Sequence, residues 1–136
     1  DRVYQLKRDF PELEIIINGG VTTLEQSQAH LQQIDGVMIG REAYTNPYLL
    51  ASVDQQFYGS NEVIKSREKI AEQFLQYVDN ELCKGTKLQA MTRHILGLFH
   101  GMPGARQYRR HISENAYKPD ATIDVLTTAL AKTTGL

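Results

Sequence analysis

The sequence predicts an α/β segment followed by an all-α segment, and three observations support this fold class. The first fifty residues contain two short apolar runs separated by a helix-like stretch, which is typical of a strand–helix–strand unit. Beyond position 59 the apolar residues recur three and four apart, as they do in amphipathic helices. Hydrophobic residues make up 41% and charged residues 23% of the 136-residue chain, which excludes a disordered protein.

Residues 14–40 predict a strand, a helix and a second strand. Glu14–Gly20 contains three consecutive isoleucines followed by glycines, which favours a strand buried on both faces. Thr22 and Glu25 have the spacing of a capping box, so we expect a helix from there to about Gln33. The run Gly36–Gly40 predicts the second strand. A strand–helix–strand unit this short is expected to have parallel strands.

A short helix is expected after the second strand, with Asn46 as its N-cap, Pro47 in its first turn and its end near Val53. Two parallel strands do not form a stable sheet alone, because parallel sheets have several strands and are covered on both faces. The chain also begins at Asp1, without an initiator methionine or a leader. We therefore expect the N-terminal third to be the end of a larger α/β domain.

Four helices joined by short loops are expected after position 59. Ser66 is the expected cap of a helix that ends at Cys83 and is followed by Gly85. Further helices are expected over residues 88–100 and 104–116 and from Asp120 onward. Their apolar positions predict the core of a small antiparallel bundle: Ile70, Phe74, Tyr77, Val78, Leu82, Leu88, Met91, Ile95, Leu98, Phe99, Ile123, Leu126 and Leu130.

Positive charge is concentrated between positions 84 and 118. This window contains seven lysines and arginines against the single acid Glu114, so its net charge is +6, whereas the rest of the chain sums to −7. Such asymmetry is typical of an anion-binding face, although a solvated helix surface has the same composition. Arg106, Arg109 and Arg110 are three or four residues apart and therefore share one face of a helix.

Glycines end both predicted strands, at the points where each strand leads into a helix. Asn18, Gly19 and Gly20 end the first strand, and Gly40 and Arg41 end the second. Glycine lets a ligand approach the backbone, and a helix N-terminus adds about half a positive charge. This pattern predicts a phosphate site. The alternative is two turns that need glycine only for their backbone angles.

Metal and membrane sites are not expected. Cys83 is the one cysteine, so a disulfide within this chain and a four-thiolate metal site are excluded, which favours a reducing, cytoplasmic setting. His94, His100 and His111 lack the spacing of metal ligands. No apolar run approaches the roughly 18 residues that a membrane span requires.

Two stretches of the sequence resemble the tRNA-dihydrouridine synthases. Ile-Ile-Asn-Gly-Gly-Val at 16–21, followed by residues 36–48, resembles the last two strands of the family's FMN-binding barrel, a pattern that several other FMN barrels share. Thr92–Asn115 resembles the C-terminal helical domain of the A subfamily, and this string is much more specific. The resemblance covers essentially the whole chain.

The resemblance implies a two-domain enzyme. Residues 1–58 would be the C-terminal part of an FMN-binding TIM barrel, contributing the last two βα units of an incomplete (β/α)₈ barrel. Residues 59–136 would be a helical tRNA-binding domain. The full-length enzyme would reduce D-loop uridines 20 and 20a to dihydrouridine, with NADPH as reductant. The family's catalytic cysteine lies in the first half of the barrel and Cys83 does not match it, so we expect no catalytic residue here and an inactive fragment.

The resemblance also implies binding residues. Arg106 and Arg109 match tRNA-contacting positions of the subfamily, whereas Arg110 and Arg93 are inferred from the local charge. The residues expected at the FMN phosphate are Asn18, Gly19, Gly20, Gly40 and Arg41.

Two alternatives stay open: another FMN TIM-barrel oxidoreductase that acts on a small molecule, and a non-catalytic RNA-binding helical module. The +6 window argues against the first, because a small-molecule enzyme does not need it. The phosphate-type loops argue against the second. Self-association through the open barrel edge would be one way to cover exposed strands.

Overall fold

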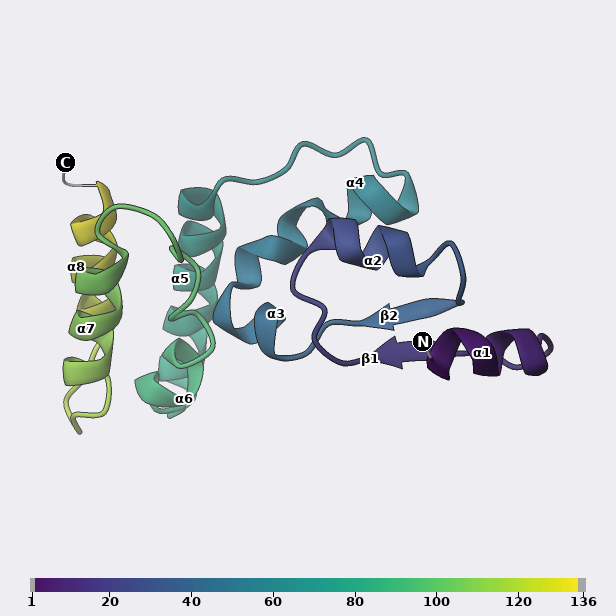
Figure 1. Ribbon diagram of the computed structural model, residues 1–136. Coiled ribbons are helices and arrows are strands. Elements are labelled where there is room, and N and C mark those ends of the chain that lie inside the picture. The colour runs from purple at the N-terminus through teal and green to yellow at the C-terminus, as the bar shows by residue number, and fades with distance from the viewer. Residues whose placement is uncertain (1, 135–136) are drawn as a thin grey trace.

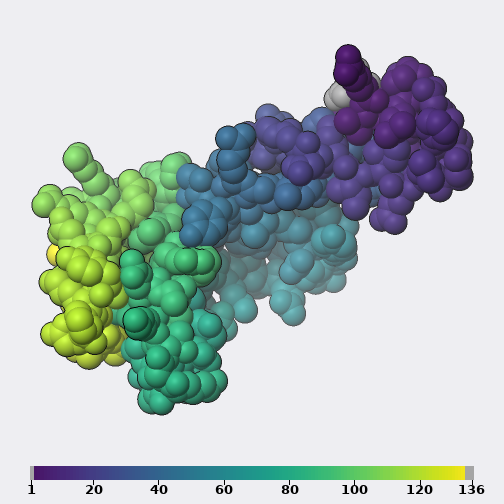
Figure 2. All heavy atoms as spheres, turned by 90° about the horizontal axis from the view of Figure 1, so that it is seen from below, coloured from purple at the N-terminus to yellow at the C-terminus, as the bar shows by residue number. Residues whose placement is uncertain are grey.

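The computed structural model describes residues 2–134 as an elongated molecule with a small α/β part and a helical part (Figure 1). The pair α7 and α8 lies at one end and α1 lies at the other, as Figure 2 also shows. In chain order the elements are α1 (Arg2–Asp9), β1 (Ile16–Asn18), α2 (Leu24–His30), β2 (Gly36–Met38), α3 (Arg41–Thr45), the 3₁₀ helix η1 (Pro47–Ser52), α4 (Val53–Tyr58), α5 (Arg67–Cys83), α6 (Leu88–Thr92), α7 (Ala105–Asn115) and α8 (Asp124–Thr134).

The two strands pair in parallel, which confirms the strand–helix–strand prediction. Ile16 is opposite Gly36 and Ile17 is opposite Val37. The expectation of burial on both faces is wrong: Ile17 is buried, whereas Ile16 is 56% exposed and Met38 is 45% exposed. Within residues 2–134, the apolar cluster that covers the sheet forms on one face only, around Ile15, Ile17 and Ile34.

The helix α1 was not predicted from the sequence, and Lys7 ties its C-terminal end to the sheet. Lys7 Nζ donates to the carbonyl oxygens of Pro11 (3.0 Å) and Leu13 (2.8 Å) and forms an ion pair with Asp35 Oδ2 at 2.7 Å. The same carboxylate oxygen accepts the N–H of Ile15 at 2.8 Å. Because Asp35 directly precedes β2, these contacts join the end of α1 to the starts of both strands.

The cap of α2 lies one residue later than the sequence predicts. Thr23, not Thr22, is the N-cap, and its hydroxyl accepts the N–H of Gln26. The side chain of Gln26 in turn accepts the N–H of Thr22 at 2.8 Å, so the side chain that returns to the start of the helix is that of Gln26 rather than Glu25. The helix ends at His30, before the predicted Gln33, and His30 Nδ1 hydrogen-bonds Tyr4 Oη at 2.5 Å.

The segment after β2 is more finely divided than predicted. A separate short helix, α3, precedes Asn46, and the turn that begins at Pro47 is a 3₁₀ helix that leads into α4. Asn46 makes no capping bond with its side chain, and its Oδ1 atom is buried without a hydrogen-bond partner.

The first helix of the helical part matches the prediction at both ends. The Ser66 hydroxyl accepts the N–H of Lys69 at the start of α5. At its end, the N–H groups of Gly85 and Thr86 bond to the carbonyls of Leu82 and Glu81, which is a Schellman motif with Gly85 at φ +87°. Tyr77, which was predicted to face the core, is 50% exposed instead.

The predicted helix over residues 88–100 is wrong beyond Thr92, although its apolar stripe is buried as expected. Tight turns follow α6, with the N–H of Ile95 bonded to Thr92 and that of Leu98 bonded to Ile95. An α-helix would pair the Ile95 carbonyl with Phe99. Here that carbonyl accepts Leu98 N–H and also the hydroxyl of Tyr108, at 3.2 Å. The last helix begins at Asp124, four residues after the predicted Asp120.

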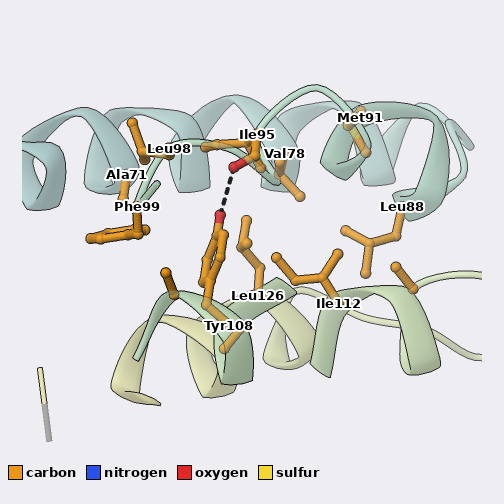
Figure 3. Packing of buried hydrophobic residues seen from close by; sticks show 13 residues of the cluster. Ala71, Val78, Leu88, Met91, Ile95, Leu98, Phe99, Tyr108, Ile112 and Leu126 are labelled. Atoms are coloured by element: carbon orange, nitrogen blue, oxygen red, sulfur yellow. Dashed lines mark hydrogen bonds between the residues drawn. The ribbon is translucent and has the colours of Figure 1, made fainter. Parts of the chain in front are cut away.

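Tyr108 is at the centre of the helical core (Figure 3). Its side chain comes from α7 and points toward Ile95, beside Leu126 of α8 and opposite Val78 of α5. Its ring meets that of Phe99 edge to face, with centroids 5.0 Å apart. The side chain is fully buried, and burial raises the pKa of its hydroxyl well above the ordinary value of a tyrosine. No helix within residues 2–134 has the length and hydropathy needed to cross a bilayer.

Candidate functional site

A cavity of about 550 Å³ lies at the carboxyl ends of β1 and β2. The two strands are adjacent and parallel, so the loops that follow them meet at this edge. The structure brings together all five residues that the sequence predicts for a phosphate. The cavity is lined by Asn18, Gly19, Gly20, Val21, Thr22, Met38, Gly40, Arg41, Glu42 and Thr45.

Gly19 and Gly20 give the cavity an open backbone wall. Their φ angles are +140° and +70°, a region that L-residues with side chains rarely adopt. A Cβ added at either position would meet no atom within 4 Å, so the space beside the backbone is free for a ligand. The two glycines therefore combine a special conformation with unobstructed access.

The segment that follows the second strand provides the charged side chains of the cavity. Gly40 is the N-cap of α3, and Arg41 is its first residue and is exposed. Glu42 lines the same cavity and opposes the positive charge of Arg41. Because α3 has only five residues, its macrodipole is small, and attraction for an anion depends on Arg41 and the free backbone N–H groups. The first turn of α2 contributes less than predicted, since Thr23 already takes one of its N–H groups.

The far end of α3 is held by the helical part. Tyr44 Oη donates to the carbonyl oxygen of Arg93 at 3.2 Å, and its ring meets the ring of His94 edge to face. Gly97 packs against the Thr45 carbonyl so closely that a Cβ on Gly97 would overlap its oxygen. The cavity and the segment that contains Arg93 therefore share one short helix.

One arginine outside the predicted set belongs to this junction. The guanidinium of Arg67 stacks on the ring of Tyr48, 3.8 Å from its centroid, and its Nε donates to the carbonyl of Leu98 at 2.9 Å. Tyr48 Oη donates to the carbonyl of Lys65 at 3.0 Å. Arg67 thus has a packing role between η1, α5 and the turns after α6.

The four predicted anion-binding arginines are all exposed but differ in their partners. Arg110 Nε bonds to Glu114 Oε1 at 2.7 Å, and this carboxylate raises the pKa of Arg110. Arg93 Nε donates to His94 Nε2 at 3.1 Å. Arg106 and Arg109 form no ion pair within residues 2–134. Their charges are therefore the least compensated of the four.

Arg93 lies beside α7, where a second cavity of about 140 Å³ separates the two segments. Arg93 lines this cavity from one side and Ser113 lines it from the other. Arg109 is one helical turn before Ser113, and Arg106 is two turns before it, so both are on the side of α7 that borders the cavity. Arg110 directs its guanidinium to Glu114, one turn further along α7.

Tyr117, which no pattern in the sequence marked as a binding residue, also lines this small cavity. It is 61% exposed. A signal was present in the sequence, since Tyr117 is an aromatic residue inside the basic window and next to Lys118. Its proximity to Arg93 could not be seen, because 24 positions separate the two residues and only the fold joins them.

Metal chemistry has no support among the described residues. Within residues 2–134, no group of three or more His, Cys, Asp or Glu side chains is close enough to hold an ion. Cys83 is a free, exposed thiol at the end of α5.

Comparison with known proteins gives one consistent result. A family model described as "Dihydrouridine synthase (Dus)" matches residues 1–134. The chain is 60% identical over 131 residues to a Vibrio cholerae protein named tRNA-dihydrouridine(20/20a) synthase. It is 58% identical over 126 residues to the Shewanella oneidensis protein of that name and 54% identical over 129 residues to the one from Escherichia coli K12. These alignments cover 96%, 93% and 95% of this chain but only 40%, 38% and 37% of the relatives.

Proposed function

The chain belongs to the dihydrouridine synthase family, and we propose that it is the C-terminal part of a flavin-dependent enzyme that reduces uridines 20 and 20a of tRNA. The observation that carries this proposal is the 60% identity, over 96% of the chain, to a relative named for that reaction. The chain spans about 40% of that relative's length, so the activity is proposed for the longer protein and not for this chain alone.

The 550 Å³ cavity supports a binding site for the phosphate of FMN. Gly19 and Gly20 would let the phosphate approach the backbone, and Arg41 would add a positive charge. Asn18 and Gly40 would complete the contacts from the ends of the two strands. When bound, the flavin supplies the hydride that reduces the uracil ring, and we assign NADPH as the source of that hydride.

The proposed domain division places residues 1–58 in the last two βα units of a TIM barrel and residues 59–136 in a helical domain. The exposed apolar side chains of Ile16 and Met38 support a larger barrel that covers this face of the sheet, since the other 60% of the relatives' length is available to supply it. In this chain alone, a second copy could cover the same strands, which is the self-association that the open edge predicts.

The exposed side of α7 supports a tRNA-binding role for the helical part. Arg106 and Arg109 have no ion-pair partner within residues 2–134, and Arg93 lies across the small cavity from the same helix. Folded RNA is bound largely through phosphates and 2′-hydroxyls, which arginine forks fit well. Arg110 is assigned a smaller role because Glu114 already engages its guanidinium. The helical part would hold the tRNA while the target uridine leaves its stack to reach the flavin.

A reconstituted reaction tests this function. The full-length protein that contains this chain is incubated with FMN, NADPH and an unmodified tRNA transcript, and dihydrouridine is mapped by position. We expect dihydrouridine at positions 20 and 20a. If the flavin-loaded protein leaves both positions unmodified, while a relative from Vibrio cholerae modifies the same transcript, the proposed function is wrong.

A further inference from the structure

The small cavity between α6 and α7 has a composition unlike that of the helical core around it. Leu96 and Ala116 contribute apolar lining, and Gln89 and Ser113 contribute hydrogen-bonding groups. Its volume of about 140 Å³ is below the roughly 300–1,000 Å³ of pockets that hold whole small molecules. The cavity has room for one flat ring, not for a folded ligand.

Tyr117 gives this cavity an exposed aromatic wall. The residue directly follows the turn that closes α7, where the Ala116 N–H bonds to Ile112 at 2.8 Å. The next residue, Lys118, is tied back to Asn115 by both its backbone N–H and its side chain. The backbone around Tyr117 is therefore fixed, while its ring remains 61% exposed.

The charges around the cavity favour nucleic acid as its occupant. Arg93 lines the cavity, and Arg109 lies one helical turn from Ser113 on the same side of α7. Lys118 adds a third cation beside Tyr117. An unpaired base carries its own phosphates, so a base in the cavity would place negative charge near all three side chains. Bases that leave a helical stack are commonly held on aromatic rings or arginine planes.

We propose that this cavity is a stacking site for one unpaired base of the bound RNA, with Tyr117 as its platform and Arg93 beside it. The proposal rests on the proposed function, because it takes the ligand to be tRNA, and it adds a contact that is not electrostatic. The base is a nucleotide other than the uridine being reduced, since the flavin would occupy the separate cavity at β1 and β2. Stacking on a ring accepts any base, so this site contributes affinity more than sequence preference.

Salt dependence separates stacking from phosphate binding. Affinity for unmodified tRNA is measured at several salt concentrations for the full-length protein and its Tyr117→Ala, Tyr117→Phe and Arg109→Ala variants. We expect Tyr117→Ala to weaken binding by roughly 5- to 150-fold, which corresponds to about 1–3 kcal/mol per stacked base, with the salt slope unchanged. Tyr117→Phe keeps the ring and should bind like the wild type. Arg109→Ala should lower the salt slope by about 1.

Tyr58→Ala is the matched control, because Tyr58 is also a large exposed tyrosine, at 79%, but lies outside the basic window. It should bind tRNA like the wild type. Wild-type affinity in Tyr117→Ala, together with a lowered slope in Arg109→Ala, would overturn the stacking site and leave the proposed function intact. Equal losses in Tyr117→Ala and Tyr117→Phe would also overturn it, since the hydroxyl would then be the contact. Wild-type affinity and a wild-type salt slope in every variant would contradict RNA binding by this side of α7 altogether.

Discussion

Gly97 packs against the carbonyl group of Thr45 with no space for a side chain between them. A Cβ on Gly97 would overlap the carbonyl oxygen and lie 2.7 Å from the carbonyl carbon and 2.9 Å from Pro47 Cδ. Thr45 is the last residue of α3, and Arg41, the first, lines the cavity proposed for the FMN phosphate. The contact therefore joins the two candidate binding regions through a helix of five residues.

Replacing Gly97 with alanine should destabilise the protein. The added methyl group meets backbone atoms, which cannot move aside as a flexible side chain can, so we expect a loss of about 1–3 kcal/mol in the free energy of unfolding. Urea denaturation measures this loss. Gly40→Ala is the control, since its Cβ would lie 3.5 Å from the flexible Met38 side chain and should cost less. Equal losses in the two variants would mean that the Gly97 contact is not tight.

Replacing Gly19 with valine should lower flavin occupancy in the full-length protein. The branched side chain would fill the space that the backbone leaves open and would be strained at φ +140°. Gly59→Val has a comparable strain at φ +66°, with no neighbour within 4 Å, and lies at the end of α4 outside the cavity. The flavin-to-protein ratio of the purified variants should fall for Gly19→Val only. An unchanged ratio would reject Gly19 as part of the phosphate site.

The three arginines of α7 should contribute unequally to tRNA binding. We expect Arg106→Ala and Arg109→Ala each to make the salt dependence of binding shallower by about one unit of slope. Arg110→Ala should change it less, because Glu114 already neutralises that guanidinium. Binding titrations from low to high salt measure the slopes. The assignment fails if Arg110→Ala has the largest effect.

The contact between Lys7 and Asp35 should make the α/β part sensitive to acid. Hydrogen bonds from Lys7 Nζ and from the Ile15 N–H lower the pKa of Asp35 in the folded state. The stabilisation is therefore complete above the pKa of an unfolded aspartate, about 3.9, and is lost as the pH falls through the lowered folded value. The protection factor of the Ile15 amide, which is its hydrogen exchange relative to the unfolded peptide at the same pH, should fall over this acidic range in the wild type. In Asp35→Ala, which has no acceptor for the Ile15 N–H, the protection factor should be low already at pH 7, and an identical pH profile in both proteins would contradict the assignment.

The sequence was sufficient wherever a local signal decided the structure. Ser66 and Gly85 bracket α5 because a hydroxyl cap and a left-handed glycine act within one helical turn. All five residues predicted for a phosphate site line one cavity, because adjacent parallel strands must end at the same edge.

The features that could not be predicted depend on contacts between segments that are distant in the sequence. The attachment of α1 depends on Lys7 reaching Asp35, and the turns after Thr92 depend on Tyr108 bonding to the Ile95 carbonyl. Thr22 and Thr23 both suited an N-cap, and the choice depends on where the Gln26 side chain returns. The sequence places Tyr117 in the basic window but does not reveal its cavity, because α6 and the turns after it form one side and α7 forms the other.

The anchoring of the C-terminal end of α3 determines where the chain tolerates insertions. An extra residue between Gly40 and Pro47 would rotate or displace Tyr44 and Thr45 and break their contacts with Arg93 and Gly97. The connection around Val63, by contrast, is exposed and has no helix or strand to disrupt. Reporter tags and loop extensions are therefore best inserted near Val63. The distance between the two candidate binding regions is fixed by α3, and this helix cannot change in length without breaking its contacts.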